Sequence, residues 1–189
     1  MSLVELVKRR FARPPEPVRI AVQATPDADE RVLAWGTLVR DEGWLVATTR
    51  GFRMVNPAGG ESDALLPWHD VASSRWNPTA DGGGSFTVTP LTEVEPGVQA
   101  RLGPRRHALS DAGNLPGVVR ERVDRTVVTS QRFPLPDRGS VLLVARRLPG
   151  QAGKEWTVVF DDEADRENPV ARETARSKLA EVLAAERPE

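Results

Sequence analysis

The sequence predicts an α+β protein with an antiparallel sheet of seven or eight strands and a C-terminal helix. From residue 30 onward, short runs of β-branched, aromatic and aliphatic residues alternate with turns that contain Gly, Pro or Asp. Four or five such runs fall within about sixty residues, a spacing that is typical of a meandering antiparallel sheet. Residues 169–187 break this pattern, because their apolar positions recur with the period of an α-helix.

The predicted strands share alternating or continuous apolar positions, and each ends at a turn-forming residue. They cover residues 31–39, 43–49, 51–56, 65–76, 85–89, 126–133, 140–147 and 155–160, with 98–102 as a further short strand. Pro67 places the start of the fourth strand at a sheet edge, since proline cannot donate a hydrogen bond to a neighbouring strand. Residues 103–114 are polar, and we expect an irregular segment there.

Two helices are predicted after residue 100. Residues 115–123 favour a short helix that Gly117 weakens. Residues 169–187 give the clearest helix, because Asn168 is a good N-cap and Pro169 suits the first helical position. Its apolar stripe, which we expect to be buried, consists of Ala175, Leu179, Val182 and Leu183.

The N-terminal segment combines an apolar stripe of helical spacing with a basic end. The stripe is Leu3, Leu6, Val7 and Phe11, and the basic residues are Lys8, Arg9, Arg10 and Arg13. Such a helix suits weak contact with an anionic membrane surface, docking on the protein, or a mobile state. Residues 14–17 are rich in proline and predict an extended spacer. We therefore divide the chain into an N-terminal segment with its spacer (1–18) and a single domain (19–189).

Composition excludes several classes of function. The chain has 189 residues, of which 26 are basic and 27 acidic, and no cysteine. Disulfides, thiolate metal sites and cysteine nucleophiles are therefore excluded. The longest apolar run, residues 141–145, is too short for a membrane-spanning helix. The N-terminal segment has its basic residues after the apolar ones, so it does not resemble a signal peptide. We therefore expect a cytoplasmic protein, with peripheral contact to a membrane as an open alternative.

Two stretches resemble a known family. They are Gly43-Trp-Leu-Val-Ala-Thr-Thr-Arg-Gly-Phe-Arg-Met-Val55 and Leu66-Pro-Trp-His-Asp-Val71. Both are similar to the hairpin pattern of GRAM and bacterial PH-like domains, and the whole chain resembles actinobacterial proteins of this size. The resemblance covers residues 30–90 and implies a split β-barrel, with helix 169–187 closing one end. PH-like domains bind lipids or peptides or serve as scaffolds, so the fold alone does not select a function.

One departure from that family argues against phosphoinositide binding. Phosphoinositide-binding PH domains place several Lys or Arg residues around the first hairpin. Here the turn is Arg40-Asp41-Glu42-Gly43, with two carboxylates where the phosphates would bind. Arg50 and Arg53 are the nearby cations.

The candidate catalytic residues are few. His69 and Asp70 are adjacent in a predicted strand, so we expect them on opposite faces. His107 and Asp111 are four residues apart, as on one helix face, but Gly103-Pro104 disfavours a helix. The glycine spacing of residues 150–154 does not match a phosphate-binding loop, and residues 161–172 lack the glycine and glutamate of a calcium loop. We therefore predict no catalytic, cofactor-binding or metal-binding residues.

These observations predict a non-enzymatic binding or scaffolding module, with a protein partner or a membrane surface as its target. The candidate binding surface is Arg50, Arg53, Trp68, Trp76, Arg101, Arg105 and Arg106. Residues 99–147 hold ten basic and four acidic residues, yet Phe133 is their single aromatic residue, which disfavours nucleic-acid binding. The alternative is a small hydrolase or metal-dependent enzyme that uses His69 or His107. The oligomeric state and the ligand stay open.

Overall fold

A computed structural model describes residues 13–57, 64–148 and 153–186. The helices in these ranges are α2 (Glu16–Gln23), α3 (Leu115–Thr126) and α4 (Pro169–Ala185), with short 3₁₀ turns at Val39–Asp41 and Trp68–Asp70. The strands are β1 (Val32–Leu38), β2 (Trp44–Thr48), β3 (Gly51–Val55), β4 (Leu66–Pro67), β5 (Val71–Pro78), β6 (Gly84–Glu95), β7 (Val98–Arg101), β8 (Arg105–Asp111), β9 (Val127–Pro134), β10 (Ser140–Arg147) and β11 (Lys154–Phe160).

The described strands form one open sheet of eleven strands in the order β4-β3-β2-β1-β8-β6-β7-β11-β10-β9, with β5 also paired to β6. All pairs are antiparallel except β7 with β11. The α+β class, the antiparallel sheet and the C-terminal helix were all predicted. The predicted strand number of seven or eight was too low, and the sheet does not close into a barrel.

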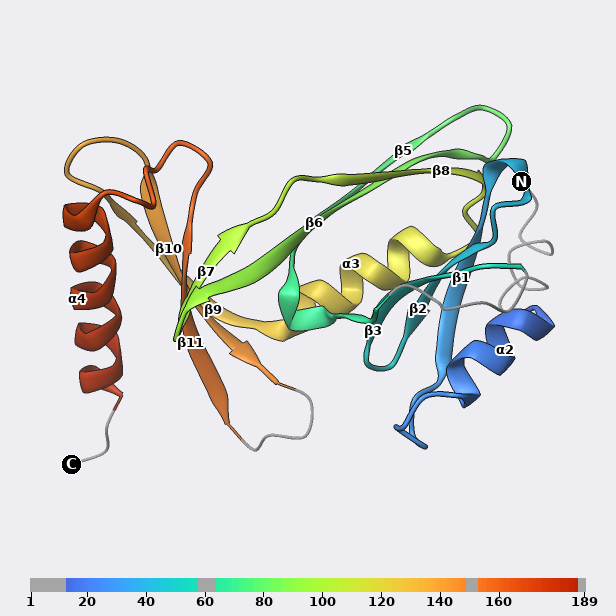
Figure 1. Cartoon of the computed structure of the whole chain (residues 1–189), viewed down its shortest axis with the longest axis horizontal. Helices are drawn as coiled ribbons and strands as arrows, with labels where there is room; N and C mark the ends of the chain where they lie inside the picture. Colours follow the sequence, from blue (N-terminus) through green and yellow to red (C-terminus); the bar gives the residue numbers. More distant parts are fainter. Residues whose placement is uncertain (1–12, 58–63, 149–152, 187–189) are drawn as a thin grey trace.

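Strand β6 belongs to two portions of this sheet (Figure 1). Its residues Gly84–Pro90 pair with β5, and part of the same stretch pairs with β8. Its residues Leu91–Glu95 pair with β7. We call β1–β5, β8 and the first part of β6 the N-terminal sheet. The C-terminal sheet consists of the last part of β6 with β7 and β9–β11.

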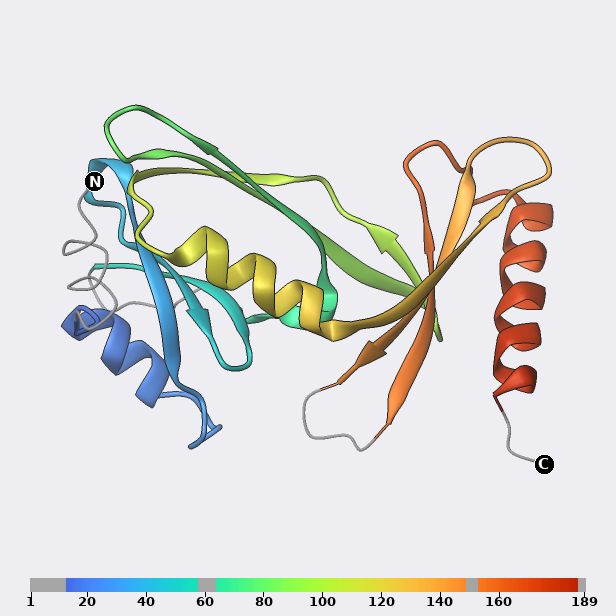
Figure 2. The same cartoon turned by 180° about the vertical axis from the view of Figure 1, so that it is seen from behind.

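Each portion of the sheet has its own core and its own helix (Figure 2). Helix α3 packs on the N-terminal sheet, where Leu115 and Val119 are fully buried. Helix α4 packs on β10 and β11 at the other end of the molecule. The expectation that helix 169–187 closes one end of a single barrel was therefore wrong, because the described sheet is open and this helix packs on β10 and β11 of the C-terminal sheet.

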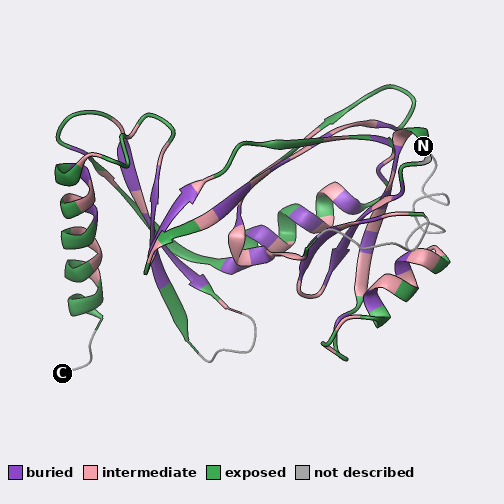
Figure 3. Ribbon diagram, viewed as in Figure 1, coloured by how far each residue is buried: buried purple, intermediate pink, exposed green. Residues whose placement is uncertain are grey.

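Helix α4 has the predicted start but a narrower buried face. The Asn168 side chain accepts hydrogen bonds from the backbone nitrogens of Val170 and Ala171, at 2.9 and 3.4 Å. Ala175 is fully buried, whereas Leu183 is 45% exposed and the outer face of the helix is open (Figure 3). The prediction of a buried stripe thus holds for Ala175 and is wrong for Leu183.

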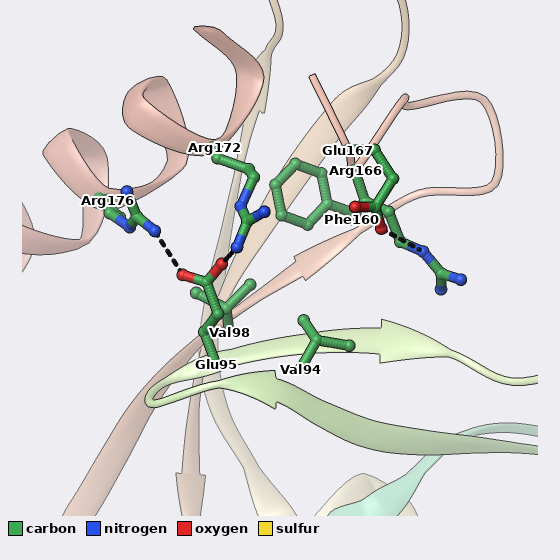
Figure 4. Close-up of a pocket in the computed structure, with 8 residues that line it drawn as sticks. All are labelled: Val94, Glu95, Val98, Phe160, Arg166, Glu167, Arg172 and Arg176. Carbon is green, nitrogen blue, oxygen red and sulfur yellow. Dashed lines mark hydrogen bonds and ion pairs between the residues drawn. The ribbon is translucent and has the colours of Figure 1, made fainter. Parts of the chain in front are cut away.

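The turn between β6 and β7 is fastened to α4 (Figure 4). The Glu95 carboxylate forms ion pairs with Arg172 and with Arg176, whose Nη2 lies 2.6 Å from Oε2. Val98 and Phe160 lie beside these ion pairs, and together with the three charged residues they line a small cavity of about 160 Å³. The contact connects the shared strand β6 to the helix of the C-terminal sheet.

Two other segments differ from expectation. Residues 105–111, predicted to be irregular, form β8, because a long antiparallel pairing with β6 supplies hydrogen bonds that a local pattern does not reveal. The strand expected at 65–76 is interrupted by the 3₁₀ turn at Trp68–Asp70. Pro67 precedes this turn.

The described part of the chain begins at residue 13, shortly before α2. The predicted spacer is shorter than expected, since Glu16 and Pro17 lie in the first turn of α2. Val18 and Val22 of α2 pack on Val46 and Val55, behind β2 and β3. The amphipathic stripe at residues 3–11 lies outside the described residues. Within the described part, none of the helices has the length and apolarity that crossing a membrane would require.

Candidate functional site

Two residues of the predicted binding surface lie in the interior. Arg53 is 6% exposed, and its Nη2 lies 2.7 and 2.9 Å from the two carboxylate oxygens of Glu30. Trp68 is buried, and its indole Nε1 donates a hydrogen bond of 3.0 Å to the carbonyl of Thr48. These side chains hold the N-terminal sheet together.

The other five residues of that surface are spread over four segments of the chain. Arg50 pairs with Asp27, a contact that raises the pKa of the arginine and lowers that of the carboxyl. Trp76 packs on Phe86, with ring centroids 6.5 Å apart. Arg101, at the end of β7, lies 3.6 Å from Asp162, which follows the neighbouring strand β11. The last two, Arg105 and Arg106, are exposed on β8.

An open groove runs between β5 and α3. It has a volume of about 600 Å³ and is lined in part by Trp76, Arg75, Gly117 and Arg120. Of the predicted surface residues, only Trp76 borders it. The groove carries one acidic side chain, that of Asp124, and its charged residues lie toward solvent.

A more polar cavity lies where the two portions of the sheet meet, and its position follows from strand alternation. On β11, Trp156, Val158 and Phe160 face the core under α4. The intervening Glu155 and Thr157 must therefore point to the opposite face of the C-terminal sheet. Register with β10 places Arg146 beside Glu155, on that same opposite face.

The 3₁₀ turn of residues 68–70 covers this opposite face. It brings His69 and Asp70 into one cavity with residues of β6, β7, β10 and β11, and we call this the junction cavity. Its volume is about 330 Å³. Its lining residues are His69, Asp70, Leu91, Thr92, Glu93, Gln99, Arg146, Leu148, Glu155 and Thr157.

Few strong contacts connect these polar groups to one another. Arg146 donates from Nη1 to the Thr126 hydroxyl at 2.9 Å, at the end of α3. The Gln99 amide lies 3.5 Å from an Asp70 oxygen, a long hydrogen bond. His69 Nε2 lies 3.9 Å from the other Asp70 oxygen. The expectation that His69 and Asp70 are separated on opposite strand faces was wrong, because they lie in a 3₁₀ turn.

Four buried polar atoms at the cavity have no hydrogen-bond partner among the described residues. They are His69 Nδ1, Gln99 Oε1, Arg146 Nε and Thr157 Oγ1. Gln99, Arg146 and Thr157 are 7%, 6% and 8% exposed, so these side chains are largely withdrawn from bulk solvent. A buried unpaired polar group costs about 1–3 kcal/mol, and most folded proteins contain few of them. A group of four at one cavity is therefore notable.

Burial also shifts the pKa values of two charged residues in the cavity. Burial raises the pKa of Asp70, an effect that His69 and Arg146 oppose and Glu93 reinforces. Burial lowers the pKa of Arg146, and Asp70 opposes that change. Such shifts are common in functional sites, where charged groups are withdrawn from water before a ligand arrives.

The second histidine lies elsewhere. His107 is on β8 in the N-terminal sheet, with its ring 6.2 Å from that of Phe52. It does not line the junction cavity. Across residues 13–57, 64–148 and 153–186, no group of three or more His, Asp or Glu side chains is arranged to hold a metal ion.

Sequence reasoning missed Gln99, Arg146 and Thr157 as site residues. A signal was present for Thr157, because it is a polar residue within the otherwise apolar stretch 156–160, whereas Arg146 stands with Arg147 at the end of its strand. Gln99 gave no comparable signal. The meeting of β7, β10 and β11 with residues 68–70 is a tertiary arrangement that no local pattern contains.

Comparison of the chain with protein-family models, with curated proteins and with solved structures finds no match.

Proposed function

We propose that the protein is a non-enzymatic binding module whose ligand occupies the junction cavity and contacts the C-terminal sheet and the 3₁₀ turn of residues 68–70. The observation that carries this proposal is the set of four buried, unpartnered polar atoms at that cavity. They come from the 3₁₀ turn and from β7, β10 and β11. A ligand with complementary donors and acceptors would satisfy them together.

The energetic argument is that these groups oppose folding in the free protein. An unpaired buried polar atom costs about 1–3 kcal/mol, which a ligand returns when it forms the missing hydrogen bond. Binding sites commonly keep such destabilising groups because function needs them. The ligand would also hold residues 68–70 against the C-terminal sheet, and would stabilise the chain by mass action.

A matched pair of substitutions tests this function. Thr157→Val removes an unpartnered hydroxyl, and Thr48→Val removes a buried hydroxyl that bonds to Glu30 at 2.7 Å and to the Gly51 carbonyl. We expect Thr157→Val to leave the melting temperature unchanged or raised, and Thr48→Val to lower it. In a thermal-shift screen of small polar compounds, a compound that stabilises the wild type should lose its effect in Thr157→Val and keep it in Thr48→Val. A screen without any stabilising compound would contradict the proposal.

A second candidate function, binding of a protein partner, is favoured by strand β9. Residues 127–132 are six consecutive exposed residues, and β9 pairs only with β10 among the described strands. An exposed edge strand can accept an extended segment of another protein. Val128→Lys should block such pairing because charge disfavours strand addition, whereas Val170→Lys, on the exposed face of α4, should not. Equal partner binding by both variants would contradict this candidate.

The assignment of a PH-like fold also stays a proposal. We propose a PH-like arrangement for residues 32–126, supported by seven strands, β1–β6 and β8, that precede helix α3 on the same sheet. Contact of the N-terminal segment with an anionic membrane, and a cytoplasmic location, also stay predictions. The alternative enzyme would now rest on His69 alone, because His107 lies away from the cavity.

A further inference from the structure

The positions and burial of the charged residues in the junction cavity indicate a class of ligand. Arg146 is the permanent cation among its described lining residues, and it is almost fully buried. Three carboxylates accompany it: Asp70, which is half-buried, and Glu93 and Glu155, which are exposed. The cavity therefore has one deep positive group and an excess of negative charge toward its opening.

The unpartnered atoms of Gln99, Arg146 and Thr157 include both donors and an acceptor, and these three side chains are almost fully buried. Arg146 Nε and the Thr157 hydroxyl offer donors, and an anionic oxygen is the strongest partner for a guanidinium. Gln99 Oε1 accepts hydrogen bonds and has no donor among the described residues. A ligand that pairs with these three atoms needs an anionic acceptor and an N–H donor, preferably a cationic one.

Size and apolar surface limit the ligand further. A cavity of about 330 Å³ lies at the small end of the range for ligand pockets. Leu91 and Leu148 line it together with the polar groups. An aliphatic side chain on the ligand would lie against these two leucines.

We propose that the ligand is a small zwitterion of the size of a free amino acid, with its carboxylate at Arg146 and its ammonium group at the cavity carboxylates. This inference rests on the proposed function, and it names the chemical class that the site takes. An aliphatic side chain on the ligand contacts the two leucines. Each charge of the ligand then has an opposite charge in the cavity.

The first test compares related compounds on the full-length chain. Leucine, valine, isoleucine and methionine are titrated by calorimetry, each beside its N-acetyl derivative and its methyl ester. The N-acetyl compound lacks the ammonium group, and the ester lacks the carboxylate. We expect at least one free amino acid to bind, and both of its derivatives to bind at least about tenfold more weakly, since each has lost one charge-assisted contact. Equal binding of either derivative overturns the inference.

The second test uses variants of one cation and one carboxylate of the site. Arg146→Gln should abolish binding, and Glu155→Gln, at an exposed position, should weaken it about tenfold without a change in folding. Glu181→Gln, which changes an exposed glutamate of α4, is the matched control and should bind like the wild type. Binding that Glu155→Gln and Arg146→Gln leave unchanged would overturn the inference.

The outcomes separate the two proposals. If no amino acid binds but compounds of another class do, and Thr157→Val removes their effect, the zwitterion inference fails and the proposed function stands. If no compound of any class binds at the cavity, both fail. If amino acids bind and the binding depends on Arg146 and Glu155, both are supported.

Discussion

The buried ion pair of Glu30 and Arg53 allows the sharpest stability prediction. Both side chains are almost fully buried, and Glu30 accepts hydrogen bonds from Arg53 and from the hydroxyl of Thr48. Glu30→Leu removes both acceptors and leaves the guanidinium buried without its counter-ion. Breaking a buried pair in this way costs about 3–5 kcal/mol. Because domains of this size have a free energy of unfolding of about 5–15 kcal/mol, the loss is a large share of the total.

Urea denaturation followed by tryptophan fluorescence measures this loss. Trp68, which bonds to the Thr48 carbonyl, reports on the same part of the sheet. A loss of about 3–5 kcal/mol corresponds to a melting temperature lower by roughly 6–20 °C. The double variant Glu30→Leu/Arg53→Met should recover most of the stability, because it removes the uncompensated charge.

The matched control for this buried ion pair is an ion pair on the protein surface. Lys178 and Glu181 form an ion pair on the surface of α4, and Glu181→Leu should cost less than about 1 kcal/mol. The reasoning is refuted if Glu30→Leu costs no more than this control, or if the double variant is no more stable than Glu30→Leu.

Three further predictions concern α4, the β6–β7 turn and the junction cavity. Ala175→Asp should destabilise the chain by several kcal/mol in chemical denaturation, because it buries a charge, whereas Leu183→Asp should change the stability by less than about 0.5 kcal/mol. Glu95→Gln should lower the free energy of unfolding by about 0.5–2 kcal/mol, with the larger loss at low salt, because two partly exposed ion pairs are weakened. Burial raises the pKa of Asp70, so the folded state holds this proton more tightly than the unfolded state does. The stability of the wild type relative to Asp70→Asn should therefore fall as the pH rises from below 3.8, the ordinary pKa of the carboxyl, through the raised pKa; a flat difference between the two pH profiles would contradict this.

Local patterns predicted much of the secondary structure. The strand at 140–147 and the start of α4 at Asn168 and Pro169 coincide with the structure, because alternation and capping depend on neighbouring residues. The short helix predicted at 115–123 is also present, extended to Thr126. These elements carry their own signals, and the α+β class followed from them.

The parts that were not predicted depend on distant pairing. Strand β8 forms because residues 105–109 pair with the first half of β6. The structure has two main cores and not the predicted single barrel, because β6 extends beyond the N-terminal sheet into the C-terminal sheet. The candidate site shares this dependence, since it brings Asp70 of the 3₁₀ turn together with Arg146 of β10. Arg53 and Trp68 were predicted as surface residues because their types suggested ligand contact, but partners far along the chain bury them.

The central claim is that the junction cavity binds the ligand, and a map of amide chemical shifts in the full-length chain tests it most directly. The probe is the amino acid, or other compound, that gives the largest thermal stabilisation. We predict that the shifted amides gather at residues 68–70, 99, 146 and 157, which lie far apart in the sequence, together with the side-chain amide of Gln99. Shifts confined to β9 or to the groove between β5 and α3, with the cavity residues unchanged, would contradict the claim.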